Sequence, residues 1–185
     1  FIVPIILISG YMMEVLKNVR DGQSRPLPEW TDFGGLFKTG LVIFGIGLVY
    51  SIPVIILACA SSTARVLPGL MDLDSDAVAA IAFAGLCLSC VQFLVLLLTS
   101  AIIPAAWIRY AQFGTFGSAF QFGEVFSFIT ANIGYYLIAI LLSWVASFIA
   151  YFGLILCLIG VVFTFFWSFL VHANLYGQLA RKAQM

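Results

Sequence analysis

Charged residues are scarce in this chain. They make up 9% of its 185 residues, whereas about a quarter of the residues in an ordinary soluble domain are charged. Eight Lys and Arg balance eight Asp and Glu, so the formal net charge is zero. This balance excludes an overall field that attracts nucleic acid or an acidic partner. The low total excludes a soluble domain, because too few polar side chains remain to cover a surface in water.

Recognisable catalytic and metal-binding patterns are also missing. The sequence has one histidine, no phosphate-binding glycine loop and no nucleophile beside a base. Cys87 and Cys90 have Cys-x-x-Cys spacing, but they and Cys59 and Cys157 lie in apolar segments without the loop residues of a zinc or redox site. We expect these cysteines to be small packing residues. The sequence therefore predicts a protein that is not an enzyme, with no catalytic residue, no metal and no cofactor.

The acidic residues do not form a recognisable site either. Asp72, Asp74 and Asp76 alternate as at the start of a calcium loop, but the chain becomes apolar directly afterwards. We expect a helix that starts here with Asp76 as its cap. Two other carboxylates, Glu14 and Glu124, lie at the expected ends of membrane segments, close in depth to Lys17 and Arg109 respectively. We expect each either to form a local ion pair with that basic residue or to extend to the membrane surface.

Long apolar runs are abundant instead. Hydrophobic residues make up 63% of the chain, and its mean hydropathy is +1.14. About 20 apolar residues cross a bilayer core as a helix, and these runs lack the alternation of a transmembrane β-barrel. The sequence predicts an all-α, polytopic transmembrane helix bundle with about five spans. The expected spans are residues 1–13, 39–60, 77–107, 128–150 and 152–172.

The lengths of these segments carry further expectations. The first run starts without Met, so we expect the N-terminus to be incomplete. The third exceeds the bilayer thickness and should tilt, or bend at Pro104. Almost no loop separates the fourth and fifth, which predicts an antiparallel hairpin.

Successive loops lie on opposite sides of the membrane, and this alternation divides the basic residues unequally between the two sides. Arg65 falls on the side of the three aspartates, and the other seven fall together, which places the basic loops and the C-terminus in the cytoplasm of a multi-pass cell-membrane protein. The seven are Lys17, Arg20, Arg25, Lys38, Arg109, Arg181 and Lys182.

Two polar and aromatic segments between spans predict short interfacial helices. Asp32 can cap the first, and Ser118 with Gln121 has capping-box spacing for the second. The first should dip one aromatic face into the acyl boundary. That face consists of Trp30, Phe33, Leu36 and Phe37.

The two interfacial segments also share a pattern at a separation of 89 positions. This pattern predicts a parallel repeat of residues 1–60 and 77–150, with the span 152–172 appended, inside a single transmembrane domain over 1–185. The matches are Arg20, Gln23, Phe33, Gly34 and Phe37 with Arg109, Gln112, Phe122, Gly123 and Phe126.

The same segments carry a family resemblance that covers nearly the whole chain. Its first half rests on Gly10-Tyr11, Leu27-Pro28-Glu29-Trp30, Phe33-Gly34, Gly40 and Pro53; its second rests on Arg109-Tyr110-Ala111, Asn132, Tyr136-Leu137 and the runs 119–125 and 172–178. In this combination the chain resembles the prokaryotic membrane protein family known as domain of unknown function 4013. The resemblance implies a helical fold and a membrane location, without a known activity.

A few polar residues lie inside the expected spans. Gln92 is central in the third span, either in a hydrogen bond between helices or on a solute pathway. His172 either packs between helices or ligates a haem or chlorophyll-type pigment. It continues one of three ridges of small residues that predict helix packing: Gly160, Thr164 and Ser168; Ala139, Ser143 and Ser147; Gly47 and Ser51.

Two functions fit these observations. The first is a non-catalytic scaffold or accessory subunit of a larger membrane complex, whose partners are the lipid bilayer and other membrane subunits. The alternative is a transporter or channel for a small or lipid-like solute, suggested by the repeat, the prolines in the spans and Gln92. Nucleic acid is not expected as a partner.

Overall fold

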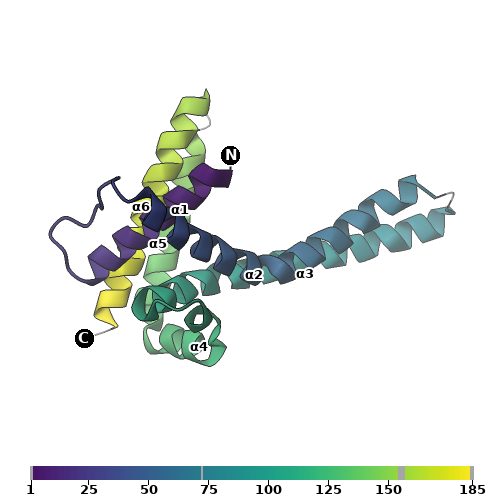
Figure 1. Cartoon of the computed structure of the whole chain (residues 1–185). Coiled ribbons are helices and arrows are strands. Elements are labelled where there is room, and N and C mark those ends of the chain that lie inside the picture. The colour runs from purple at the N-terminus through teal and green to yellow at the C-terminus, as the bar shows by residue number, and fades with distance from the viewer. Residues whose placement is uncertain (1, 72, 154–156, 184–185) are drawn as a thin grey trace. The chain divides into compact units, whose positions relative to one another are not determined.

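A computed structural model describes residues 2–71, 73–153 and 157–183 of the chain (Figure 1). Within these ranges every regular element is helical and none is a strand, which confirms the all-helical fold class. The α-helices are α1 (Ile2–Arg20), α2 (Phe33–Val66), α3 (Ser75–Phe113), α4 (Phe122–Ala131), α5 (Ile133–Tyr151) and α6 (Cys157–Lys182). Two short 3₁₀ helices, η1 (Leu67–Gly69) and η2 (Phe116–Phe120), lie between them.

Four of the described helical segments are long and apolar enough to cross a membrane. They are Phe33–Gly69, Ser75–Phe113, Ile133–Tyr151 and Gly160–Lys182. These correspond to four of the five spans expected from the sequence. The first expected span is helical as well, but α1 is not one of the four.

The chain divides into two compact units. Unit 1 comprises Phe1–Ile46 and Pro104–Met185, and unit 2 comprises Gly47–Ile103. The boundaries fall inside α2 and α3, and the second coincides with Pro104, through which α3 stays helical. The predicted repeat would divide the chain at other positions, and it stays a prediction. Helices α2 and α4 begin at Phe33 and Phe122, which are separated by the 89 positions of that repeat.

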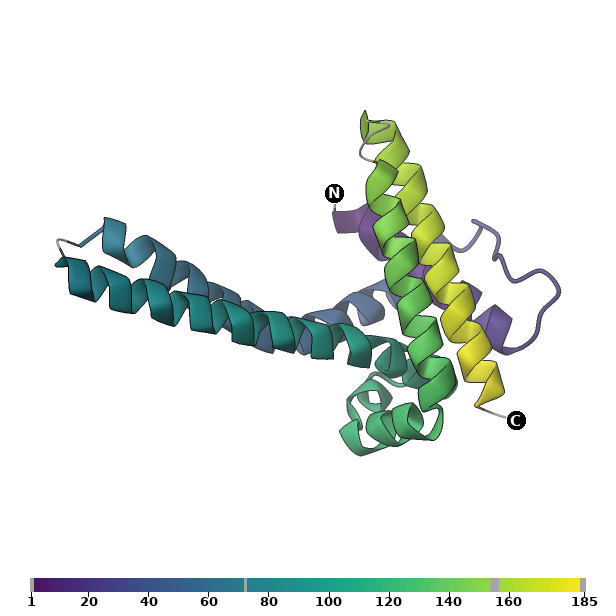
Figure 2. The same ribbon diagram turned by 180° about the vertical axis from the view of Figure 1, so that it is seen from behind.

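Unit 1 is built around α1, α5 and α6. Helix α6 packs against both α1 and α5, and α5 and α6 run antiparallel as the predicted hairpin (Figure 2). The consecutive residues Tyr11, Met12 and Met13 are all buried. Successive residues of a helix point in different directions, so protein covers more than one face of α1. Helix α1 is therefore the core of unit 1.

Helix α1 crosses the start of α2 at two glycines. A side-chain carbon added at Gly10 would overlap the carbonyl oxygen of Leu36, and one added at Gly40 would overlap the carbonyl oxygen of Ile6. Only a residue without a side chain allows two helix backbones to approach this closely. Leu36 is buried at the same crossing.

The first predicted interfacial segment differs from the expectation. Asp32 does cap a helix, because its Oδ1 accepts the N–H of Gly35 at 2.9 Å. That helix is α2 itself, which continues into the span without a break, so no separate short helix forms. Trp30 precedes the helix and stacks on Tyr11 of α1, with ring centroids 4.3 Å apart. The ring of Trp30 also lies 6.3 Å from that of Phe33, but Leu36, a third member of the predicted aromatic face, is buried against α1 and does not reach lipid.

The second interfacial segment is helical, but its predicted cap is wrong. The hydroxyl of Ser118 donates to the carbonyl of Thr115 at 2.6 Å, and Gln121 at the start of α4 makes no capping bond with its side chain. Helix α4 ends at Ala131 and is followed by Asn132, whose side-chain amide donates to the carbonyl of Phe128 at 3.0 Å. Such local bonds compete with helix continuation. The fourth span therefore begins at Ile133, five residues later than predicted.

Unit 2 is an antiparallel pair formed by the second part of α2 and the first part of α3. The helices approach closely where Gly85 faces Ala64. Helix α3 begins two residues earlier than expected, at Ser75, and its cap is Asp74 rather than Asp76, since Oδ1 of Asp74 accepts the N–H of Ala77 at 2.7 Å. Asp72 lies outside the described residues.

Candidate functional site

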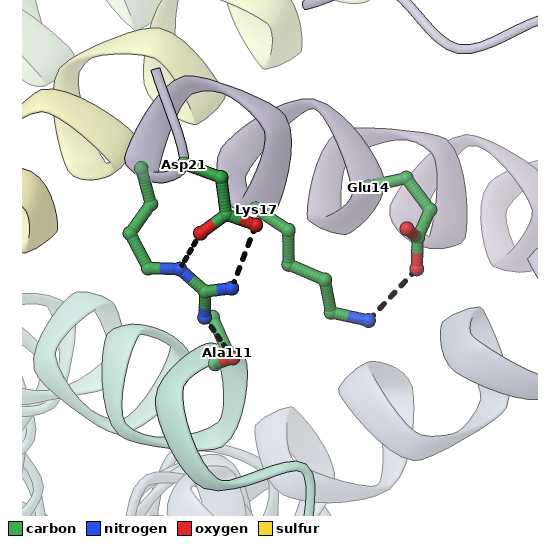
Figure 3. Close-up of polar contacts among 5 residues, drawn as sticks. Glu14, Lys17, Asp21 and Ala111 are labelled. Atoms are coloured by element: carbon green, nitrogen blue, oxygen red, sulfur yellow. Dashed lines mark hydrogen bonds and ion pairs between the residues drawn. The ribbon is translucent and has the colours of Figure 1, made fainter. Parts of the chain in front are cut away.

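The end of α1 in unit 1 carries a cluster of charged side chains (Figure 3). Nζ of Lys17 lies 2.8 Å from Oε1 of Glu14, which confirms that predicted pair. Arg20 donates to both carboxylate oxygens of Asp21, at 2.7 and 3.0 Å, and also to the carbonyl oxygen of Ala111 in α3. The hydrogen bond from Arg20 lowers the pKa of Asp21 below its ordinary value of 3.8. These contacts join the ends of α1 and α3.

The end of α3 carries a second set of polar contacts. Arg109 donates to the side-chain oxygen of Gln121 at 3.0 Å and lies 3.7 Å from Glu124, which confirms the second predicted pair. Its guanidinium also lies 4.4 Å from the ring centre of Phe113. A glycine with positive φ follows each of these two helices, Gly22 at 70° two residues after α1 and Gly114 at 69° directly after α3. Glycine adopts this conformation without strain.

These contacts bear on the predicted sidedness of unit 1. Lys17 lies 6.0 Å from the ring centre of Tyr110, and Arg20 contacts Ala111. Lys17, Arg20 and Arg109 are therefore at the same end of unit 1, as the alternation of spans required. The direction in which this end faces across a membrane stays a prediction.

His172 lies between α6 and α5. Its Nε2 is 2.9 Å from the carbonyl oxygen of Ser143 and 3.2 Å from the hydroxyl of Ser147. Because a carbonyl only accepts, Nε2 carries the hydrogen in this arrangement. The nitrogen that a pigment metal would use is thus engaged by the neighbouring helix, which favours the packing interpretation of His172.

The small residues that precede His172 on α6 face the small residues of α5. Oγ1 of Thr164 donates to the carbonyl of Ala150 at 2.9 Å, and Ser168 is buried. On the α5 side Ala139 and Ser143 are buried as well. The two ridges predicted from i, i+4 spacing are therefore the two sides of one helix contact.

The polar residues of unit 2 pair across its two helices. The amide oxygen of Gln92 accepts from the hydroxyl of Ser61 at 3.0 Å, and Ser61 is buried. Arg65 donates to Ser89 at 2.7 Å. Gln92 therefore makes the hydrogen bond between helices that was one of its two predicted roles.

The cysteines are placed differently from the expectation. Cys59, Cys87 and Cys90 are free thiols and exposed, so they do not pack inside the chain. The side chain of Cys157 is outside the described part. Across the described residues, no group of three or more His, Cys, Asp or Glu is arranged to hold a metal ion.

A family model described as protein of unknown function (DUF4013) matches residues 1–173, which is nearly the whole chain. The chain belongs to the DUF4013 family. Comparison with curated proteins and with solved structures gives no match. Several residues on which the resemblance rested have structural roles in this DUF4013 protein: Gly10 and Gly40 form the helix crossing, His172 joins α5 to α6, and the hydroxyl of Tyr136 accepts the N–H of Ala105 at 3.2 Å.

The DUF4013 chain also contains a cavity that sequence reasoning missed. It has a volume of about 420 Å³ and lies where the end of α1 and the turn after it meet the end of α6. We call it the basic pocket; its lining includes Gln23, Asn174, Gln178, Arg181 and Lys182. The spacing of the four α6 residues hints at one polar face, but the approach of residues 19–26 is a tertiary feature that the sequence does not display.

Proposed function

We propose that this DUF4013 protein is a non-catalytic scaffold or accessory subunit of a larger complex in a prokaryotic cell membrane. Its apolar candidate spans make it a multi-pass membrane protein. The main support for the proposal is that polar side chains within those spans bond to neighbouring helices of the same chain. Gln92, Arg65, Thr164 and His172 each hydrogen-bond to the neighbouring helix. Side chains committed to packing favour a structural role over a chemical one.

The surface of unit 2 supports a role in assembly. Exposed small residues occur along α3, at Ala79, Ala80, Ala82 and Ala84. Small side chains allow another helix to approach closely in a membrane, where lipid tails are no less apolar than leucine. Larger exposed apolar side chains lie among these alanines and farther along α3, where they add contact area: Phe83, Leu86, Phe93, Leu94 and Leu98.

The transporter alternative receives less support. It depended on Gln92 as a polar group available to a solute, and Ser61 already occupies the amide oxygen of that residue. A pathway would also require polar groups that converge without satisfying one another. We therefore place the scaffold first.

Copurification tests the proposal directly. The protein is extracted from its native membrane in a mild, lipid-preserving detergent, and the proteins that remain bound are identified and quantified. We expect partners in fixed stoichiometry. A monodisperse, partner-free protein would contradict the proposal and would direct attention to solute uptake in reconstituted liposomes.

The exposed thiols of unit 2 provide a second, site-directed test. A lipid-soluble photoactivatable maleimide, which crosslinks through C–H bonds and needs no amine on the partner, is applied to intact membranes, where Cys59, Cys87 and Cys90 lie on the outside of the helix pair. We expect crosslinks to another membrane subunit. The triple variant Cys59→Ser/Cys87→Ser/Cys90→Ser is the control and should lose them. Crosslinks that persist unchanged in this variant would place the partner elsewhere.

The proposed orientation puts the basic ends in the cytoplasm. Support comes from the grouping of Lys17, Arg20 and Arg109 at one end of unit 1 together with the positive-inside rule. Single cysteines introduced at Ala183 and Ser75 test it with a membrane-impermeant maleimide. We expect Ser75→Cys to react in intact cells and Ala183→Cys only after permeabilisation; the reverse pattern would invert the orientation.

A further inference from the structure

The basic pocket of unit 1 has the chemistry of an anion site. Arg181 and Lys182 supply two cations, and Gln23 and Gln178 supply amide groups. The described lining contains no carboxylate. The nearest carboxylate along the chain, Asp21, is bound to Arg20. Among the described lining residues, none therefore offsets the positive charge of Arg181 and Lys182.

An apolar groove lies on the other side of the same ridge of α6. It has a volume of about 160 Å³, between Ile138 and Leu142 of α5 and Leu175 and Leu179 of α6. Gln178 and Lys182 line both the groove and the basic pocket. The groove thus begins where the basic pocket ends.

Lys182 marks the junction between the two cavities. Its ammonium lies 3.8 Å from the ring centre of Tyr135, which also lines the groove. A lysine held over an aromatic ring is typical of the polar–apolar boundary of a membrane, where the ring contacts acyl chains and the ammonium stays with headgroups.

We propose that the two cavities together bind one anionic phospholipid. The phosphate would lie in the basic pocket against Arg181 and Lys182, and one acyl chain would lie in the groove between α5 and α6. Charge complementarity selects an anionic group, because the pocket offers cations and amide donors. The adjoining groove selects an amphiphile over free phosphate, which has no apolar part to bury there.

The chain offers a matched control for the charges. Arg25 and Lys38 are exposed basic residues of unit 1, and neither lines the basic pocket. The site variant Arg181→Gln/Lys182→Gln and the control variant Arg25→Gln/Lys38→Gln remove the same total charge. If the two variants differ in lipid binding, the difference is due to the basic pocket and not to the general attraction of a basic surface for anionic lipid.

The experiment uses the full chain in an uncharged detergent and counts bound lipid by native mass spectrometry. Phosphatidylglycerol is the anionic probe, phosphatidylcholine with the same chains is the neutral probe, and inorganic phosphate is the probe without chains. We expect the wild type to bind phosphatidylglycerol most tightly. The site variant should bind it roughly 30-fold more weakly, since each of the two basic residues contributes a factor of about five, and the control variant should match the wild type.

A second pair of variants tests the groove. Leu142 lines it, and its neighbour Leu141 is exposed without lining it. We expect Leu142→Ala to weaken the binding of long-chain phosphatidylglycerol by about threefold or more, because apolar contact area is lost, and Leu141→Ala to leave it unchanged. Short-chain dihexanoyl phosphatidylglycerol should bind both variants equally. Leu142→Ala alters no charged residue, so this pair keeps the test valid if the site variant fails to fold.

Three results would overturn the proposal. Equal losses in the site and control variants would show general surface attraction. Inorganic phosphate that competes as strongly as the lipid would show a free-anion site. Equal binding of phosphatidylcholine would remove the role of charge. None of these results depends on whether the protein has partner subunits.

Discussion

Unit 1 and unit 2 differ in how much of their surface is buried by other parts of the chain. In unit 1, consecutive residues of α1 are buried and charged side chains join the ends of α1 and α3. In the described part of unit 2, Tyr50 is the single apolar side chain that is buried. Ser61 is buried with it, bonded to Gln92. Unit 1 therefore has a core of buried side chains, whereas most side chains of the two helices of unit 2 are left for lipid to cover.

Because of this difference, unit 1 and unit 2 should be stabilised in different ways. A protein core loses stability when its packing is disturbed, because close-packed neighbours relax only partly. A helix pair in lipid has the same apolar contacts available whether or not its helices touch, so packing and a few hydrogen bonds provide the specificity. Substitutions of the same chemical kind should therefore cost much more in unit 1 than in unit 2.

Glycine substitutions should show the largest contrast. In Gly10→Ala the new methyl group would overlap the carbonyl oxygen of Leu36, so the α1–α2 crossing must open. We expect a loss of about 3 kcal/mol, at the upper end of overpacking effects, measured by thermal unfolding in detergent.

The matched substitution in unit 2 is Gly47→Ala. Apart from the neighbouring residues and backbone of its own helix, no atom lies within 4 Å of the added methyl group at this position. Alanine favours helices over glycine by roughly 0.5–1 kcal/mol, so we expect unchanged or slightly higher stability. Equal losses in the two variants would mean that the contrast between the units is not one of packing.

The contact between α5 and α6 should give the next largest effect. His172→Leu removes the bonds from Nε2 to Ser143 and Ser147 while keeping an apolar side chain of moderate size. Hydrogen bonds between membrane helices contribute up to about 1.7 kcal/mol, so we expect a loss of about 1 kcal/mol in thermal unfolding.

The absorption spectrum of the same His172→Leu sample separates packing from pigment binding. A packing residue predicts equal, colourless spectra for wild type and variant. Pigment retained by the wild type and lost in the variant would assign His172 to a ligand role instead.

The helical fold and the α5–α6 contact could be predicted from the sequence because each leaves a local pattern. Apolar runs of sufficient length require helices, since lipid satisfies no backbone group. Small residues at i, i+4 spacing indicate close helix approach, and the ridges of Ser143 and Thr164 do face one another. The pairs of Glu14 with Lys17 and of Glu124 with Arg109 followed from the similar depth expected for the partners at the ends of membrane segments.

The remaining features depend on contacts between distant segments. The stacking of Trp30 on Tyr11 is one such contact, and no spacing in the sequence indicates it. The break at Asn132 depends on a local choice between a capping bond and a continuous helix, which apolar composition cannot decide. The basic pocket needs residues 19–26 beside the end of α6. Hydropathy indicates the length of a span, but it does not indicate which face of the helix packs against other parts of the protein.

The hydrogen bond of unit 2 should have a smaller effect than that of His172. Gln92→Leu removes the acceptor of Ser61, whose hydroxyl still has the carbonyl of Ala58 at 3.1 Å. Because no buried donor is left without a partner, we expect a loss of about 0.6 kcal/mol. The double variant Gln92→Leu/Ser61→Ala should lose no more than the single variant. Intact folding with loss of a measured solute flux would instead favour the transporter.

The smallest expected effect is the pH dependence that Asp21 gives to the charged end of unit 1. Arg20 lowers the pKa of Asp21 in the folded protein below its ordinary value of 3.8, so the folded state favours the ionised carboxylate. This contribution is fully present above the ordinary value and is lost as the pH falls through the lower folded value. Water screens the pair, because the side chain of Asp21 is 48% exposed. We expect a shallow loss of thermal stability below about pH 4, flattened in Asp21→Asn. A steep acid transition that survives in Asp21→Asn would show that other carboxylates, and not this pair, make the charged end of unit 1 sensitive to pH.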